Sequence, residues 1–181
     1  MKELLLDTLD SPIGTVLIVA DGERLCALDF GDCEERMMML LKRHYGSVQF
    51  VQSADPMGFS SRVRAYFAGD LQSLDGIPVS TGGTDFQQQV WTALRTIRPG
   101  TTSTYKDLAI KLGKPTAYRA VGATNALNPV GIVLPCHRVI GSDASLTGYA
   151  GGLARKEWLL QHENASVHQT KSQQVQQLPL I

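Results

Sequence analysis

The sequence has few cysteines, no long apolar run and no excess of either charge. Three cysteines among 181 residues, an odd number with uneven spacing, do not indicate a disulfide scaffold. No apolar run reaches the roughly 18 residues that a membrane-spanning helix needs, so no membrane partner is expected. The apolar stretch at the N-terminus, Leu4–Leu6, is too short for a secretory signal. These absences predict a protein of the reducing cytoplasm.

Zero net charge conceals an uneven distribution of charged residues along the chain. The whole sequence has 17 basic and 17 acidic side chains. Residues 1–84 contain 7 Lys and Arg against 12 Asp and Glu, whereas residues 85–163 contain 9 against 5. An anion such as a nucleic acid is therefore expected to bind the second part.

Residues 1–80 show the pattern of a strand meander with helices packed on it. Apolar and β-branched residues predict strands around two turn signals, Ser11–Gly14 and Asp21–Gly22. The sequence then predicts two helices with a strand between them: Glu34–Tyr45, Val48–Val51 and Ser60–Phe67. This order is typical of an α+β protein with a ribonuclease-H-like α/β subdomain at its N-terminus. No residue of this part indicates chemistry.

Turn-forming residues in Leu74–Gly83 mark the expected boundary between two domains, 1–80 and 81–163. The remaining residues, 164–181, are rich in glutamine and have little to pack. This tail is therefore predicted to be disordered.

The second domain is predicted to be mostly helical. Thr84 and Gln87 fit a capping box at the start of a helix that is expected to continue to Pro99. Two further helices, Tyr105–Leu112 and Pro115–Leu127, are separated by a glycine-containing turn of about two residues. They predict a helix-turn-helix, the arrangement that many DNA-binding proteins use.

The second helix of this pair has unusually small side chains, which would let it approach a nucleic-acid groove closely: Ala117, Ala120, Val121, Gly122, Ala123 and Ala126. After it, Gly131–Leu134 is predicted as a short buried strand. A last amphipathic helix is predicted over Leu153–His162.

The segment Pro135–Val139 gives the clearest indication of chemistry. A thiol reacts as a thiolate, so a reactive cysteine needs a base or a positive charge nearby, and Cys136 is followed by His137 and Arg138. Neighbouring residues of a strand face opposite sides, so His137 would act on Cys136 only through a sharp turn or a water. From spacing alone, a small buried cysteine beside a satisfied interior histidine stays open as an alternative.

Taken together, four segments resemble the methylated-DNA–protein-cysteine methyltransferases, also called O6-alkylguanine-DNA alkyltransferases. They are Asn128-Pro129, Pro135–Val139, Gly148–Leu153 and Lys156–Glu163, within roughly residues 85–163. The resemblance implies a repair protein that flips an O6-alkylated guanine, or an O4-alkylated thymine, out of double-stranded DNA. It would move the alkyl group irreversibly onto its own cysteine, once per molecule.

The resemblance also implies catalytic roles for single residues. Cys136 matches the alkyl acceptor, and His137 matches the histidine that takes the thiol proton through a water. Glu163 matches the carboxylate that orients and charges that histidine. Tyr105 matches the tyrosine that helps to rotate the flipped nucleotide and to protonate or hydrogen-bond the base. Asn128 matches the asparagine that braces the turn before the active-site segment.

For DNA, Arg119 matches the arginine that leaves its helix and fills the gap in the base stack. Small residues of the same helix would allow it to enter the minor groove: Ala117, Ala120 and Ala123. The substrate pocket and its lid are implied to include Pro135, Val139, Tyr149, Ala150, Gly151 and Gly152. Gly131 stands where some family members have a proline, so a wider pocket that accepts alkyl groups larger than methyl is expected.

No cofactor is expected for the transfer. Cys26, Cys33 and His44 could be imagined as zinc ligands, but their spacing matches no standard zinc pattern, so no metal site is predicted. No obligate protein partner is indicated, and a monomer is expected.

Two other functions are weighed against alkyl transfer. A lesion sensor of the alkyltransferase-like type would flip alkylated guanine without chemistry, but such relatives usually have another residue at the position of Cys136. A helix-turn-helix transcriptional regulator would need base-reading side chains at the start of its recognition helix, where this sequence has alanine, glycine and a single arginine.

Overall fold

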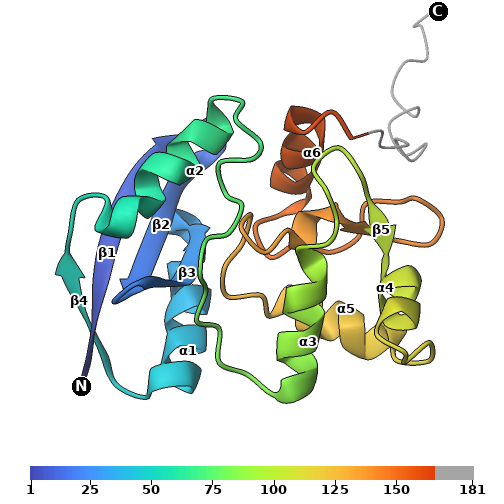
Figure 1. Cartoon of the computed structure of the whole chain (residues 1–181), viewed down its shortest axis with the longest axis horizontal. Helices are drawn as coiled ribbons and strands as arrows, with labels where there is room; N and C mark the ends of the chain where they lie inside the picture. Colours follow the sequence, from blue (N-terminus) through green and yellow to red (C-terminus); the bar gives the residue numbers. More distant parts are fainter. Residues whose placement is uncertain (166–181) are drawn as a thin grey trace, which may run out of the picture.

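A four-stranded sheet in the order β3-β2-β1-β4 forms the centre of the N-terminal part (Figure 1). The computed structural model describes residues 1–165. The first three strands form the predicted antiparallel meander, and β4 pairs with β1 in parallel. The strands span Lys2–Ser11 (β1), Gly14–Asp21 (β2), Arg24–Phe30 (β3) and Val48–Gln52 (β4).

Both faces of this sheet are covered, which explains the continuous apolar runs in its strands. Met37 of α1 and Leu17 of β2 belong to the buried cluster on one face. Val63 of α2 and Ile18 of β2 belong to the larger cluster on the other. The covering helices, each preceded by a 3-10 turn, are η1 (Gly31–Cys33), α1 (Glu34–Tyr45), η2 (Pro56–Gly58) and α2 (Phe59–Phe67).

The C-terminal part is mostly helical, so the predicted α+β fold with a helical C-terminal subdomain is confirmed (Figure 1). Two short strands, β5 and β6, pair in parallel within it. Among residues 1–165, no helix is long and apolar enough to cross a membrane. The elements are α3 (Asp85–Leu94), β5 (Ser103–Thr104), α4 (Tyr105–Lys111), α5 (Tyr118–Ala126), η3 (Cys136–Arg138), β6 (Val139–Ile140) and α6 (Leu153–His162).

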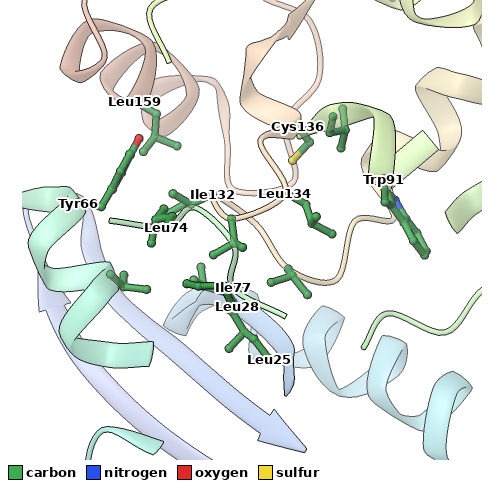
Figure 2. Packing of buried hydrophobic residues seen from close by; sticks show 14 of the residues in the cluster. Leu25, Leu28, Tyr66, Leu74, Ile77, Trp91, Ile132, Leu134, Cys136 and Leu159 are labelled. Atoms are coloured by element: carbon green, nitrogen blue, oxygen red, sulfur yellow. The ribbon is translucent and has the colours of Figure 1, made fainter. Parts of the chain in front are cut away.

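One buried cluster joins the two parts, and Figure 2 labels its members from both sides, among them Leu25, Leu28, Trp91, Ile132 and Leu134. Backbone hydrogen bonds strengthen the contact. Leu28 N donates to Pro129 O (3.1 Å), and Gly131 N donates to Leu28 O (3.0 Å). The segment that leads to Cys136 therefore lies along the edge of the sheet formed by β3, and the sheet positions it.

Two helix boundaries predicted from the sequence are wrong. Helix α3 ends at Leu94 and not near Pro99, because the next three N–H groups bond to carbonyls three residues back and tighten the chain into turns. Helix α5 begins at Tyr118 and not at Pro115, because Ala117 N donates to Lys114 O (2.9 Å) and closes a separate turn. The turn of the helix-turn-helix is therefore longer than the two residues predicted.

The strand predicted over Gly131–Leu134 is also wrong. This segment is a turn in which Val133 N donates to Gly131 O (2.7 Å) and Ile132 has a φ of +67°. Only Val130 forms a bridge with β3, to Leu28, so the apolar residues that follow are buried by packing and not by sheet pairing. An apolar run of this length does not distinguish the two cases.

The capping box at the start of α3 is confirmed and can be tested by its effect on stability. Gln87 N donates to Thr84 Oγ1 (3.2 Å), and Thr84 N donates to Gln87 Oε1 (3.0 Å). We expect Thr84→Ala to lower the free energy of unfolding by about 1 kcal/mol, because the N–H of Gln87 loses its side-chain acceptor. Urea unfolding of the full chain measures this loss, and Thr92→Ala, inside the same helix, is the control that removes no cap. Equal stability of Thr84→Ala and the parent would contradict the prediction.

Candidate active site

The segment Pro135–Val139 folds as the 3-10 turn η3 followed by β6. Arg138 N donates to Pro135 O (3.0 Å), which closes the sharp turn that the sequence required between Cys136 and His137. Cys136, His137 and Arg138 are only 5%, 0% and 7% exposed. Three reactive or charged side chains therefore start from one buried turn.

Glu163, directly after α6, accepts hydrogen bonds from three of the surrounding side chains. Its Oε1 accepts from His137 Nε2 (2.8 Å), Arg138 Nη2 (2.8 Å) and Tyr66 Oη (2.7 Å), and its Oε2 accepts from Arg138 Nε (2.9 Å). Glu163 is 2% exposed. A carboxylate at such a depth is stable only with partners of this kind.

These contacts determine the protonation states. Burial acts to raise the pKa of Glu163, but the hydrogen bonds from His137 and Arg138 outweigh it and hold the pKa of this carboxyl well below its usual range. Burial lowers the pKa of His137, and although Glu163 opposes this, Arg138 and Lys156 act in the same direction as burial. Glu163 is thus ionised and His137 neutral at neutral pH.

A neutral His137 has one ring proton, and the ionised Glu163 assigns it to Nε2. The other ring nitrogen, Nδ1, is buried and has no hydrogen-bond partner within residues 1–165. Its lone pair can therefore accept a proton.

The groups around Cys136 change the pKa of its thiol in opposite directions. Burial raises its pKa, whereas the side chain of Asn128 and the ammonium of Lys156 lower it. Lys156 is 0% exposed and donates from Nζ to Val139 O (2.6 Å) and Thr147 O (2.7 Å). Burial lowers the pKa of Lys156 to about 8. The surroundings thus supply a positive charge that favours the thiolate once a base has taken the proton.

Two asparagines hold the backbone around Cys136. Asn128 bridges the turn after α5, since its Nδ2 donates to Leu134 O (2.7 Å) and its Oδ1 accepts from Val130 N (3.0 Å). Asn125, which sequence reasoning did not select, donates from Nδ2 to Cys136 O (3.3 Å). The end of the helix-turn-helix is therefore tied directly to the active-site turn.

A small cavity lies beside Cys136. Its volume is about 10 Å³, which is about the space that one water needs. Tyr149, Ala150 and Gly151, all predicted as pocket residues, line this cavity. The structure does not bring the other three there: Pro135 lines a separate cleft, Val139 is buried in the core, and Gly152 precedes α6.

Gly131 also lines the cavity. A Cβ added there would lie 3.3 Å from Leu28 O and 4.0 Å from Tyr149 Oη. Its N–H is bonded to Leu28 O, so a proline at this position would lose a hydrogen bond as well as add volume. An alanine is the cleaner probe of the space that the glycine leaves.

The residues predicted to contact DNA gather on α5 and at the start of α4. Arg119, Ala120 and Ala123 are exposed, and Ala117 is half-buried just before α5. Tyr105 opens α4; its hydroxyl lies 3.3 Å from Thr147 Oγ1, which donates to it. The exposed surface of α5 thus has small side chains beside Arg119, whose guanidinium lies 5.9 Å from the centroid of the Tyr118 ring.

Sequence reasoning missed Tyr66 and Lys156 and misjudged Arg138. The sequence suggested Arg138 as a positive charge for Cys136, but the structure pairs it with Glu163 and with Ile97 O (2.6 Å). Lys156 lies in a segment that resembles the family and could have been selected there. Tyr66 precedes Glu163 by 97 residues, and no motif marks it.

The residues considered as zinc ligands have separate surroundings. Cys26 Sγ donates to Val19 O in the core, Cys33 lies beside Ala150 O (3.7 Å), and His44 contacts Ser80 (3.1 Å). Within the part of the chain that the structure describes, no three His, Cys, Asp or Glu side chains group as metal ligands.

Two family models match the chain. One, described as the ribonuclease-like domain of 6-O-methylguanine DNA methyltransferase, matches residues 4–81. The other, described as the DNA binding domain of the same protein, matches residues 85–165.

Curated relatives and solved structures agree with these models. A methylated-DNA–protein-cysteine methyltransferase of Shigella flexneri is 47% identical over 166 residues, 90% of this chain and 97% of the relative. One of Methanosarcina barkeri is 45% identical over 87% of this chain and 95% of the relative. The crystal structure of Mycobacterium tuberculosis OGT in complex with DNA is similar with a TM-score of 0.76, at 37% identity, over 90% of this chain and 92% of that one.

The buried pair of His137 and Glu163 predicts how stability depends on pH. Both pKa values lie below those of the unfolded chain, so the unfolded chain binds more protons and stability falls as the pH decreases. The loss due to His137 begins near its ordinary pKa of 6.5, and that due to Glu163 begins near 4.5. The free energy of unfolding, measured with urea across this range, should therefore fall as the pH decreases. His137 should contribute up to about 1.4 kcal/mol per pH unit to this slope.

Two variants test the contribution of His137 to the pH dependence of the free energy of unfolding. His137→Gln should flatten the slope just below pH 6.5, where the histidine titrates when the chain unfolds. His44→Gln should also flatten the slope, because burial lowers the pKa of this half-buried histidine as well, and it gives the contribution of a histidine outside the Glu163 cluster; the double variant should flatten the slope by the sum of the two. An unchanged slope in His137→Gln would contradict the assignment of a neutral His137.

Proposed function

The chain belongs to the 6-O-methylguanine DNA methyltransferase family, and we propose that it repairs DNA by moving the alkyl group of O6-alkylguanine onto its own Cys136. It is an enzyme of the methylated-DNA–protein-cysteine methyltransferase class. O4-alkylthymine is a second substrate of the same kind. The observation that supports this function best is the buried arrangement of Cys136, His137 and Glu163 around one turn.

The transfer is a substitution at the alkyl carbon. The Cys136 sulfur forms a bond to this carbon while the bond from the carbon to O6 breaks. The thiol proton passes through a water to the unpaired His137 Nδ1, and the imidazolium is stabilised by the ionised Glu163. Guanine leaves with the electrons of the broken bond and takes up a proton, a step in which we assign the Tyr105 hydroxyl as the donor. The thioether has no route back to a thiol, so each molecule reacts once.

The base must leave the helix to reach Cys136. We propose that α5 enters the minor groove, where Ala120 and Ala123 allow close approach, and that Arg119 takes the place of the flipped nucleotide. The crystal structure of the M. tuberculosis relative in complex with DNA supports the binding of DNA by a protein of this fold. Because the cavity beside Cys136 is small, the loop at Tyr149–Gly151 must move outward to admit a base.

The remaining expectations follow from the same proposal. The division of the chain at about residue 80 separates a supporting domain, 1–80, from the reacting domain, 81–163. The predicted disorder of 164–181 falls almost wholly outside the described residues. We propose that the protein acts as a monomer in the cytoplasm and needs no cofactor, metal or obligate protein partner.

Mass spectrometry after incubation with a duplex that contains one O6-methylguanine tests the transfer. The tryptic peptide Ala120–Arg138 contains Cys136 and no other cysteine. We expect this peptide alone to gain the mass of a methyl group in place of a hydrogen, with one methyl per protein and no turnover, since the thioether is stable.

Two variants control this experiment. Cys136→Ser should abolish the transfer, whereas Cys26→Ser, which replaces a buried thiol that donates to Val19 O away from the cavity, should preserve it. Binding of the duplex with an unmodified peptide would contradict the proposal and favour the lesion sensor.

The space beside Gly131 predicts tolerance of larger alkyl groups. We expect Gly131→Ala to slow the repair of O6-butylguanine by roughly tenfold or more relative to O6-methylguanine, because the added methyl narrows the cavity near Tyr149. Single-turnover rates on the two duplexes measure the ratio. Gly148→Ala is the control, because a Cβ there meets no atom within 4 Å. Equal slowing of both lesions in Gly131→Ala would overturn the prediction.

A further inference from the structure

Tyr66 brings the N-terminal part into the hydrogen-bond network of the active site. It lies in α2, is 0% exposed, and donates from its hydroxyl to Glu163 Oε1 at 2.7 Å. Figure 2 shows its ring pointing from α2 toward Leu159 of α6. The N-terminal part, in which the sequence indicated no chemistry, thus supplies one of the donors to the carboxylate that holds His137.

The position of the Tyr66 ring is fixed on several sides. Its edge meets the rings of Phe67 (5.5 Å between centroids) and His162 (5.2 Å). Its backbone carbonyl is also 2.7 Å from His162 Nε2, which ties α2 to α6. A phenol held this way cannot turn to another partner without repacking, so its hydrogen bond to Glu163 is a permanent part of the site.

We propose that Tyr66 is a positioning residue of the reaction: by donating to Glu163 Oε1, the atom that also accepts from His137 Nε2, it sets how strongly His137 holds a proton. A carboxylate oxygen that shares its charge with a phenol attracts the neighbouring imidazole proton less strongly. Tyr66 therefore keeps His137 neutral, and ready to accept the Cys136 proton, at a lower pH than Glu163 alone would allow. This inference rests on the proposed alkyl transfer.

The other charged and titratable groups around His137 are unchanged by the loss of the Tyr66 hydroxyl. Arg138 from η3 and Lys156 from α6 oppose a positive charge on His137, and Glu163 favours it. Cys136 precedes His137 in the same turn, and Tyr149 of the following loop lines the cavity beside Cys136. After removal of the hydroxyl, Glu163 Oε1 still accepts from His137 and Arg138, so no buried acceptor is left unpaired.

The rate of methyl transfer as a function of pH in Tyr66→Phe tests this role. We expect the acid limb of the profile to move to higher pH by about 0.5 to 1 unit, roughly half of what one hydrogen bond to a charged group is worth, because only the part of the bond that differs between the two states of His137 counts. Tyr45→Phe is the matched control, because it removes the hydroxyl of another N-terminal tyrosine, bonded to Ser80 (3.2 Å) and away from Glu163. A purely structural role would lower the rate at every pH and leave the limb in place, which would overturn the proposal.

A second substitution covers the case in which Tyr66→Phe does not fold. Replacement of Tyr66 by 3-fluorotyrosine keeps the hydroxyl and makes it a stronger donor, so the acid limb should move to lower pH. A limb that stays in place, or moves in the opposite direction, would contradict the role assigned to Tyr66.

The reaction of Cys136 with iodoacetamide separates this inference from the proposed function. The label is read on peptide Ala120–Arg138, without DNA, and its acid limb should shift in Tyr66→Phe as the transfer profile does. If the labelling profile shifts in Tyr66→Phe but the parent transfers no methyl group, the role of Tyr66 is upheld and alkyl transfer is rejected. Methyl transfer with an unshifted labelling profile would reject the role of Tyr66 alone.

Discussion

The buried carboxylate of Glu163 is the constraint on which the rest of the site depends. A negative charge at 2% exposure is tolerated only because Arg138, His137 and Tyr66 donate to it. The guanidinium of Arg138 balances the charge, which leaves His137 free to stay neutral. The same carboxylate fixes the ring proton of His137 on Nε2. The base that Cys136 needs is therefore prepared by a salt bridge in which Cys136 takes no part.

This constraint also explains why the two parts of the chain share one core. Arg138 reaches Ile97 O after α3, and Tyr66 reaches Glu163 from α2, so the carboxylate is enclosed from both parts. Asn125 ties η3 to the end of α5, and Asn128, just after α5, bonds to Leu134 O shortly before η3. A change in the position of the DNA-facing helix would therefore act on the backbone of Cys136 directly.

The sequence predicted those features that depend on residues close together in the chain. The capping box of Thr84, the bounds of α1 and the turns of the meander follow from local patterns, and all are present. The turn at Gly131–Leu134 was not predicted, because an apolar run looks alike in a strand and in a buried turn. Tyr66 was not predicted, because it lies 97 residues from Glu163 and only the folded chain brings them together.

The protonation state of His137 in the free protein tests the central claim most directly. Nitrogen-15 NMR of the labelled imidazole at neutral pH, assigned by comparison with His137→Gln, distinguishes the two neutral tautomers from the imidazolium. We predict a neutral ring with its proton on Nε2, bonded to Glu163, and an unprotonated Nδ1. A proton on Nδ1, or a ring protonated at both nitrogens, would contradict the account, because His137 could not then accept the proton of Cys136.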